Sequence, residues 1–107
     1  MNKLIITDEA YQDIFEISEF IAQYNERAAK ETIQFLFGTC NNLLDFPRWG
    51  VKKDAIKAKD VRIYIARQYL IAYCIDKDKI VILKVSNQYQ DIYTRLWQFN
   101  QNCQLSF

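Results

Sequence analysis

Three short segments between residues 61 and 85 constrain the fold more than any other part of this sequence, because apolar side chains alternate along each of them. Successive side chains of a β-strand point to opposite faces of a sheet. The alternation therefore predicts strands at about 61–66, 69–75 and 80–85. Arg67 and Gln68 remain between the first two segments. They indicate a two-residue turn and hence an antiparallel meander.

This turn decides which side chains share a face of the sheet. It places Ala66 opposite Tyr69 and Arg62 opposite Tyr73. One of the two resulting sets is wholly apolar, and we expect it to form the core beneath the helices. That set comprises Val61, Ile63, Ile65, Leu70, Ala72, Cys74, Val81, Leu83 and Val85. The set expected on the outer face comprises Arg62, Tyr64, Tyr69, Tyr73, Ile82 and Lys84.

The first half of the chain predicts a strand followed by two helices. Residues 3–7 read "KLIIT", a β-branched apolar segment, and Thr7 or Asp8 suits a helix N-cap. Apolar residues then recur every three or four positions, at 10, 14, 17 and 21 and again at 29, 33, 36, 40 and 43. This spacing is typical of one buried face on each of two helices. Pro47 and Gly50 end the second helix.

Together these elements predict an α+β fold in a single domain, residues 1–107. A helix hairpin packs on one face of a mainly antiparallel four-stranded sheet. Residues 51–60 read "VKKDAIKAKD" and are expected to form an exposed loop. A helical spacing through Ile92 and Leu96 indicates a short C-terminal helix.

The composition excludes several kinds of site. The chain has no histidine, and Cys40, Cys74 and Cys103 are far apart, which argues against a metal site or a disulfide framework. We expect Cys40 and Cys74 to be buried free thiols and predict no cofactor. No apolar run has the length of a membrane span, and the first residues do not resemble a signal peptide, so a cytoplasmic protein is expected.

The formal net charge of +1 conceals two oppositely charged halves. Residues 1–45 hold three basic and eight acidic residues, a charge of −5, whereas residues 46–107 hold eleven basic and five acidic residues, a charge of +6. The basic half could face nucleic acid or an acidic protein partner. The alternative is two solvated faces that carry no function.

The order of these elements, with four sequence motifs, resembles the RelE/ParE superfamily of bacterial toxins. The opening "ITDEAYQDIFEISEFIAQYNERAA" is similar to the start of that family, and "LLDFPRWG" is similar to its L-x-x-F-P-x-x-G turn. "VRIYIARQYLIAYCID" resembles its R-x-x-x-x-x-x-Y-x-I-x-Y hairpin, and "IVILKVSNQYQDIY" its last strand. The resemblance extends from residue 1 to about residue 96.

The resemblance implies the toxin of a type II toxin–antitoxin system, neutralised by a cognate antitoxin in a hetero-oligomer. One branch of the superfamily consists of ribosome-dependent mRNA endoribonucleases, and another inhibits DNA gyrase without being an enzyme by itself. We favour the ParE-like, gyrase-inhibiting branch over the RelE-like one. A third interpretation is a degenerate, non-toxic interaction domain.

Site residues follow from the resemblance. In the nuclease branch, Lys57, Lys59, Arg62 and Tyr93 would be catalytic, but Asn87 stands near the place of a second arginine. The residues expected to bind the antitoxin or the target comprise Lys52, Lys53, Lys57, Lys59, Arg62, Tyr64, Tyr73, Ile82, Lys84, Asn87 and Gln90.

Overall fold

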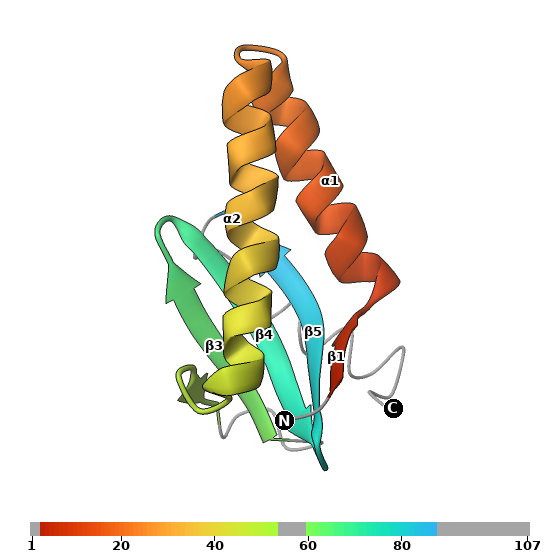
Figure 1. Cartoon of the computed structure of the whole chain (residues 1–107), viewed down its shortest axis with the longest axis vertical. Helices are drawn as coiled ribbons and strands as arrows, with labels where there is room; N and C mark the ends of the chain where they lie inside the picture. Colours follow the sequence, from red (N-terminus) through yellow and green to blue (C-terminus); the bar gives the residue numbers. More distant parts are fainter. Residues whose placement is uncertain (1–2, 54–59, 88–107) are drawn as a thin grey trace.

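The computed structural model describes residues 3–53 and 60–87 of the chain. Its elements are, in order, β1 (Lys3–Ile6), α1 (Asp8–Ala22), α2 (Glu26–Asp45), β2 (Val51–Lys52), β3 (Asp60–Ala66), β4 (Tyr69–Asp76) and β5 (Lys79–Ser86). Figure 1 shows the two helices as a long hairpin packed on the sheet, which confirms the predicted α+β fold. The predicted C-terminal helix lies outside the described residues.

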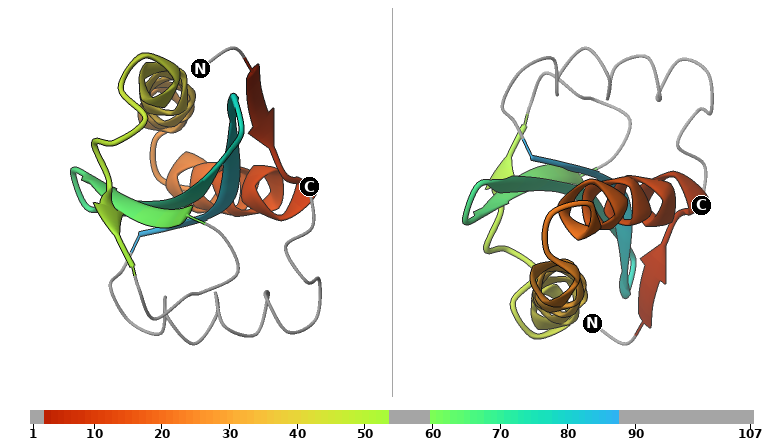
Figure 2. Two further views of the ribbon diagram at one scale, coloured as in Figure 1. Left: turned by 90° about the horizontal axis from the view of Figure 1, so that it is seen from below. Right: turned by 90° about the horizontal axis from the view of Figure 1, so that it is seen from above.

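The sheet has five strands in the order β1-β5-β4-β3-β2. β1 pairs parallel with β5, and the remaining neighbours are antiparallel. The fifth strand, absent from the prediction, is the two-residue β2 at the start of the stretch expected to be a loop. In the end-on views of Figure 2 the sheet curves toward α2, and β1 lies at the edge away from β3.

Each helix begins at the side-chain cap that its sequence provides. The Thr7 hydroxyl accepts a hydrogen bond from the backbone N–H of Ala10, and Asn25 accepts one from Ala28 in the same way. Such caps satisfy backbone donors that have no partner within the helix. None of the helices in the described part of the chain is long and apolar enough to cross a membrane.

The predicted pairing of β3 with β4 is confirmed. Ala66 lies opposite Tyr69, and Arg62 lies opposite Tyr73. The turn between them contains no glycine, and Arg67 adopts a φ of 58°. That left-handed conformation costs an L-residue roughly 1–2 kcal/mol. The Arg67 guanidinium carbon lies 3.9 Å from the centroid of the Phe35 ring, a cation–π contact that offsets part of this cost.

The predicted assignment of the two sheet faces is wrong. The helices pack instead on the set that contains Tyr69, Ile71, Tyr73, Ile80 and Ile82. The members of the predicted core set that form a second apolar cluster, on the opposite face, are Val61, Ile63, Leu70, Ala72, Cys74, Val81 and Leu83. Alternation could not distinguish the faces because both are apolar and buried. The arginine at position 62 had suggested solvent on the face that in fact meets the helices.

The two other members of the predicted core set depart from this pattern for local reasons. Ile65 is exposed near the end of β3. Val85 lies on the helix side because β5 contains a bulge: Ala72 pairs with Lys84, but the next residue, Tyr73, pairs with Ile82. An extra residue in one strand shifts the alternation that follows it.

The two cysteines within the described residues, Cys40 and Cys74, are buried thiols, as predicted. Burial raises the pKa of the Cys40 thiol to about 12. A thiol with so high a pKa is almost entirely protonated near neutral pH and is a poor nucleophile. Cys40 therefore packs as a small apolar residue.

Thr7 connects the three elements that meet where β1 ends. Besides capping α1, its hydroxyl lies 2.9 Å from the carbonyl oxygen of Ile82, and its backbone N–H donates to the same carbonyl at 3.1 Å. The residue thus ends the pairing of β1 with β5 and starts α1 at one point. The position of α1 over the sheet depends on it.

Replacement of Thr7 by valine should lower the free energy of unfolding by about 1–2 kcal/mol, because it removes the cap of α1. The matched control is Thr32→Val, since the Thr32 hydroxyl donates to the Ala28 carbonyl within its own helix. That change should cost less than about 0.5 kcal/mol. Urea denaturation followed by circular dichroism measures both, and equal losses would contradict the role of Thr7.

Candidate functional site

The hydroxyl of Tyr73 fixes the turn between α2 and β2. This side chain is fully buried in β4. Its hydroxyl donates to the carbonyl oxygen of Pro47 at 2.7 Å and accepts from the backbone N–H of Gly50 at 2.8 Å. Burial raises the pKa of the Tyr73 phenol above its usual value of 10.0, so the hydroxyl stays protonated and can donate. One side chain therefore fixes both ends of the turn.

Arg62 holds the same turn from the neighbouring strand. Its Nη1 donates to the carbonyl oxygen of Gly50 at 3.0 Å. Its Nε lies 3.2 Å from Oδ1 of Asp60, in a geometry that makes an ion pair rather than a hydrogen bond. Only 14% of the Arg62 side chain is exposed. The arginine in the middle of β3 is thus compensated by a carboxylate and packed against the turn.

Gly50 is required by this close approach rather than by an unusual backbone angle. A Cβ atom at this position would lie 2.7 Å from the Tyr73 hydroxyl oxygen and 3.0 Å from Cβ of Arg62. Contacts that short force the neighbours to move. The "FPRWG" segment is therefore shaped by the space between the turn and two strand residues.

We call residues 46–50 the anchored turn. Three aromatic rings stack on its outer side. The Phe46 and Trp49 rings are 4.5 Å apart and nearly parallel, at 2°. Tyr64 of β3 stacks on Trp49 with 5.6 Å between ring centroids. Phe46 is 50% exposed and Trp49 is 46% exposed. The anchored turn therefore presents a rigid apolar surface to solvent.

A hollow of about 460 Å³ opens beside these rings. Its described lining consists of Phe46, Pro47, Arg48 and Trp49, and its wall is mostly carbon. Arg48 is exposed at this position. The volume falls in the range of small-ligand pockets, about 300–1,000 Å³, so an apolar side chain of a partner would fit.

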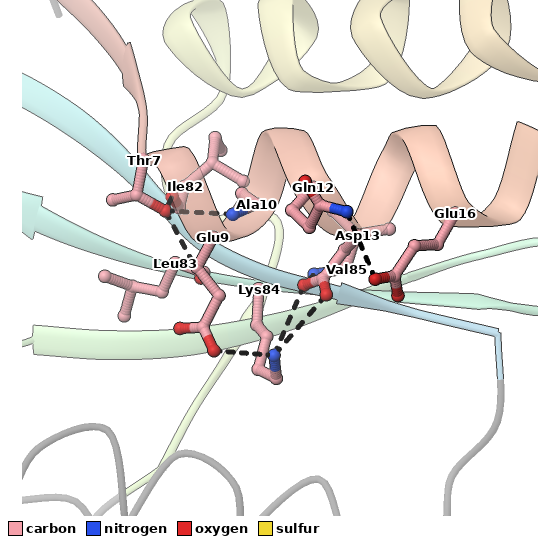
Figure 3. Close-up of polar contacts among 10 residues, drawn as sticks. All are labelled: Thr7, Glu9, Ala10, Gln12, Asp13, Glu16, Ile82, Leu83, Lys84 and Val85. Carbon is pink, nitrogen blue, oxygen red and sulfur yellow. Dashed lines mark hydrogen bonds and ion pairs between the residues drawn. The ribbon is translucent and has the colours of Figure 1, made fainter.

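Lys84 lies in a second polar cluster, which joins β5 to α1 (Figure 3). Its Nζ lies 3.1 Å from Oε1 of Glu9 and 3.4 Å from Oδ2 of Asp13. Only 9% of the Lys84 side chain is exposed. Its charge is therefore compensated within the chain by two carboxylates one helical turn apart.

Asp13 also completes the hydrogen bonding of β5. Beyond the end of β1, its Oδ2 accepts the backbone N–H of Val85 at 3.0 Å. Burial raises the pKa of Asp13 above its ordinary value of 3.8, and the Val85 N–H and Lys84 oppose that rise. Figure 3 shows the carboxylates of Glu9 and Asp13 pointing from α1 to the same lysine. The cluster is a structural contact between helix and sheet.

Comparison with known proteins supports a family assignment. Residues 4–92 match the family model described as "ParE toxin of type II toxin-antitoxin system, parDE". The chain belongs to the ParE toxin family. This confirms the toxin–antitoxin class predicted from the sequence.

A solved structure titled "Chromosomal ParDE TA system from P. aeruginosa" shares the fold of this ParE-family toxin. It superposes with a TM-score of 0.67 at 17% sequence identity, over 80% of this chain and 95% of that one. No curated protein matches the chain at a significant level.

The predicted binding residues of this ParE-family toxin do not share one exposed face. Tyr73 and Ile82 are fully buried beneath the helices, so their predicted place on an exposed outer face is wrong. Lys84 is also buried, but it pairs with Ala72 beyond the bulge and therefore lies on the opposite face, where Glu9 and Asp13 compensate its charge. Arg62 and Tyr64 lie on the same side of the sheet and contact the anchored turn.

The remaining predicted residues are more accessible or are not described. Lys52 and Asn87 are exposed, and Lys53 is half-buried. The predicted residues that lie outside the described part of the chain are Lys57, Lys59, Gln90 and Tyr93. Partner binding by the accessible residues stays a prediction.

The sequence interpretation missed the aromatic stack, although its signal was visible. Phe46 and Trp49 flank the proline of the turn motif, where only chain reversal was considered. Two large aromatic residues within four positions of a turn indicate an apolar patch, and such a patch marks a contact surface. The carboxylates that compensate Lys84 were also visible, as Glu9 and Asp13 at a spacing of four in the first helix.

Replacement of Gly50 by alanine should destabilise the protein by about 1–3 kcal/mol, because the new methyl group overlaps the Tyr73 hydroxyl. Gly38 is the matched control: a Cβ there meets nothing within 4 Å, and the residue lies inside α2. Gly38→Ala should stabilise by about 0.5–1 kcal/mol. Thermal unfolding measures both changes, and two shifts of the same sign would contradict this account of Gly50.

Replacement of Lys84 by methionine should cost about 2 kcal/mol at pH 7, because it leaves partly buried carboxylates without their cation. Removing Lys84 also removes a factor that lowers the pKa of Asp13, so that pKa rises further above 3.8. A raised carboxyl pKa means that the folded state holds the proton more tightly, so stability falls as pH rises through the interval above 3.8. The deficit should therefore be smaller at pH 4 than at pH 7.

The matched control for this test is Lys30→Met, an exposed lysine on α2. It should change stability by less than about 0.5 kcal/mol at either pH. Urea titrations at pH 4 and pH 7 measure all three proteins. A Lys84→Met deficit that is independent of pH would contradict the role given to Asp13.

Proposed function

We propose that this ParE-family toxin inhibits DNA gyrase and is neutralised by a cognate antitoxin that binds its basic half. The family match over residues 4–92 supports the toxin class. One observation favours gyrase rather than mRNA as the target. Arg62, the strand arginine that a nuclease would use, already makes an ion pair and a hydrogen bond within the fold.

Cleavage of RNA requires cations that converge on the phosphate as charge develops in the transition state. Arg62 is the described member of the candidate nuclease set, and its guanidinium contacts Asp60 and the Gly50 carbonyl. Lys84, a buried cation of β5, is compensated by Glu9 and Asp13. Neither of these two cations is therefore available for a phosphate.

Inhibition of gyrase makes a different demand, since a protein inhibitor needs a stable contact surface rather than a reacting group. The anchored turn with its exposed aromatic rings supplies a surface of that kind. The network of Arg62 and Tyr73 keeps it in place without a ligand. Preorganisation of this sort reduces the entropy that binding loses.

The direct experiment compares the two activities with one protein preparation. Purified toxin should inhibit supercoiling of relaxed plasmid by gyrase, or trap cleaved DNA, in proportion to its concentration. The same toxin should leave mRNA intact in a translating extract, as read by primer extension. Adding the co-purified antitoxin should restore supercoiling.

Codon-specific mRNA fragments from the unaltered toxin would overturn the gyrase proposal. Their loss in an Arg62→Ala variant that keeps its circular dichroism spectrum would then make Arg62 a phosphate ligand of an endoribonuclease. Absence of both activities would leave an interaction domain without toxicity. Each result thus selects one of the three interpretations that the sequence left open.

A further inference from the structure

Among the described residues, two pairs of exposed aromatic side chains differ in the charge around them. Phe15 and Phe20 are 55% and 60% exposed on α1, where Glu16 and Glu19 accompany them. Phe46 and Trp49 are similarly exposed, but Arg48 lies between them. The two surfaces therefore suit partners of opposite charge.

The surface at Phe46 and Trp49 is held more rigidly than an ordinary turn. The Pro47 carbonyl and both backbone groups of Gly50 are hydrogen-bonded to Tyr73 and Arg62, which come from β4 and β3. These bonds span 12 to 26 residues of sequence. The bonds at Pro47 and Gly50 thus hold the backbone on either side of Trp49, while almost half of the Trp49 side chain stays exposed. Rigid, partly exposed Trp and Arg residues are characteristic of binding hot spots.

The stacking favours a protein partner over a nucleic acid. Phe46 and Tyr64 both stack on Trp49, and the described aromatic pairs include no contact between the two of them. Two rings of the fold thus already stack on the indole, which leaves less of its surface for a nucleotide base. What remains accessible is the hollow beside the rings, which fits an apolar side chain.

The charge at the hollow selects the kind of segment that carries this side chain. Arg48 lines the hollow, and among the described residues no carboxylate lies within ion-pair distance of it. Lys52 is exposed on β2, two residues beyond Gly50. A partner segment with carboxylates next to its apolar anchor is therefore attracted here and repelled by the acidic surface of α1.

We propose that the hollow formed by Phe46, Pro47, Arg48 and Trp49 is the docking site for an acidic segment of the cognate antitoxin. A leucine, isoleucine or phenylalanine of that segment fills the hollow against Trp49. Its flanking Asp or Glu residues face Arg48 and Lys52. The proposal rests on the proposed function, since it assumes that a neutralising antitoxin exists.

Binding of the purified small protein encoded beside the gene for this chain tests the site. Trp49→Ala should weaken binding by about 30-fold or more, mainly through faster dissociation. Arg48→Glu changes only an exposed side chain and keeps the site testable if Trp49→Ala disturbs the turn. It should weaken binding about tenfold, through slower association, and the effect should shrink as salt rises.

Tyr24→Ala is the matched control. Tyr24 is 77% exposed in the turn between the helices, at the far end of the 20-residue α2 (Figure 1). Its removal should change the affinity less than about twofold. Biolayer interferometry gives both rate constants, and circular dichroism checks that each variant is folded.

Three outcomes would overturn the proposal. If the unaltered chain binds the neighbouring protein and both Trp49→Ala and Arg48→Glu bind it equally well, the docking site is wrong while the proposed function stands. If the unaltered chain does not bind that protein at all, the site has no occupant and the proposed neutralisation fails as well. If a fluorescein-labelled single-stranded oligonucleotide binds in a Trp49-dependent manner and the protein does not, the surface recognises nucleic acid instead.

Discussion

The hydroxyl of Tyr73 is the contact on which the arrangement of the exposed surface depends. It lies beneath the α2–β2 turn and binds Pro47 and Gly50 at once. Without the Tyr73 hydroxyl, the turn would not be held at a fixed distance from β4. The Gly50 carbonyl that orients Arg62 would then no longer be held in place. A buried phenol that makes both of its hydrogen bonds contributes more to specificity than to net stability, because the same bonds form with water in the unfolded chain. The result is a surface turn as well defined as a core element.

The elements of this fold could be predicted from the sequence, but the orientation of the sheet could not. Alternation and the turn at Arg67-Gln68 define the pairing of β3 with β4 without reference to the rest of the molecule. Which face meets the helices depends on long-range packing, and here both faces are apolar. Arg62 was misleading because a charge within a strand usually indicates solvent, whereas its partner Asp60 lies only two residues away.

The candidate site was harder to predict for a related reason. Net charge per half of the chain treats every lysine and arginine as available to a partner. Arg62 and Lys84 count toward the basic half, yet both are compensated by carboxylates of the fold, and the carboxylates around Lys84 come from the acidic half. Fewer basic side chains than predicted are therefore available to a partner, and Arg48 and Lys52 are among those that remain. The motif "DFPRWG" contained the aromatic rings of the site, but their stacking on Tyr64 needs a contact 15 residues away in sequence.

The contact of Asp13 with the backbone of Val85 has a consequence for assembly. An uncovered strand edge invites the edge of another molecule, which can lead to open-ended polymers. β1 covers β5 only as far as Ile82, and beyond it α1 lies against the strand and supplies a carboxylate where a further strand would supply a carbonyl. The uncovered part of β5 is therefore closed to strand addition by a charged group, which an incoming strand would have to displace from both the Val85 N–H and Lys84. In the described part of the chain, strand addition is thereby limited to the two edge strands, β1 and β2, and β2 lies next to the turn that carries Trp49.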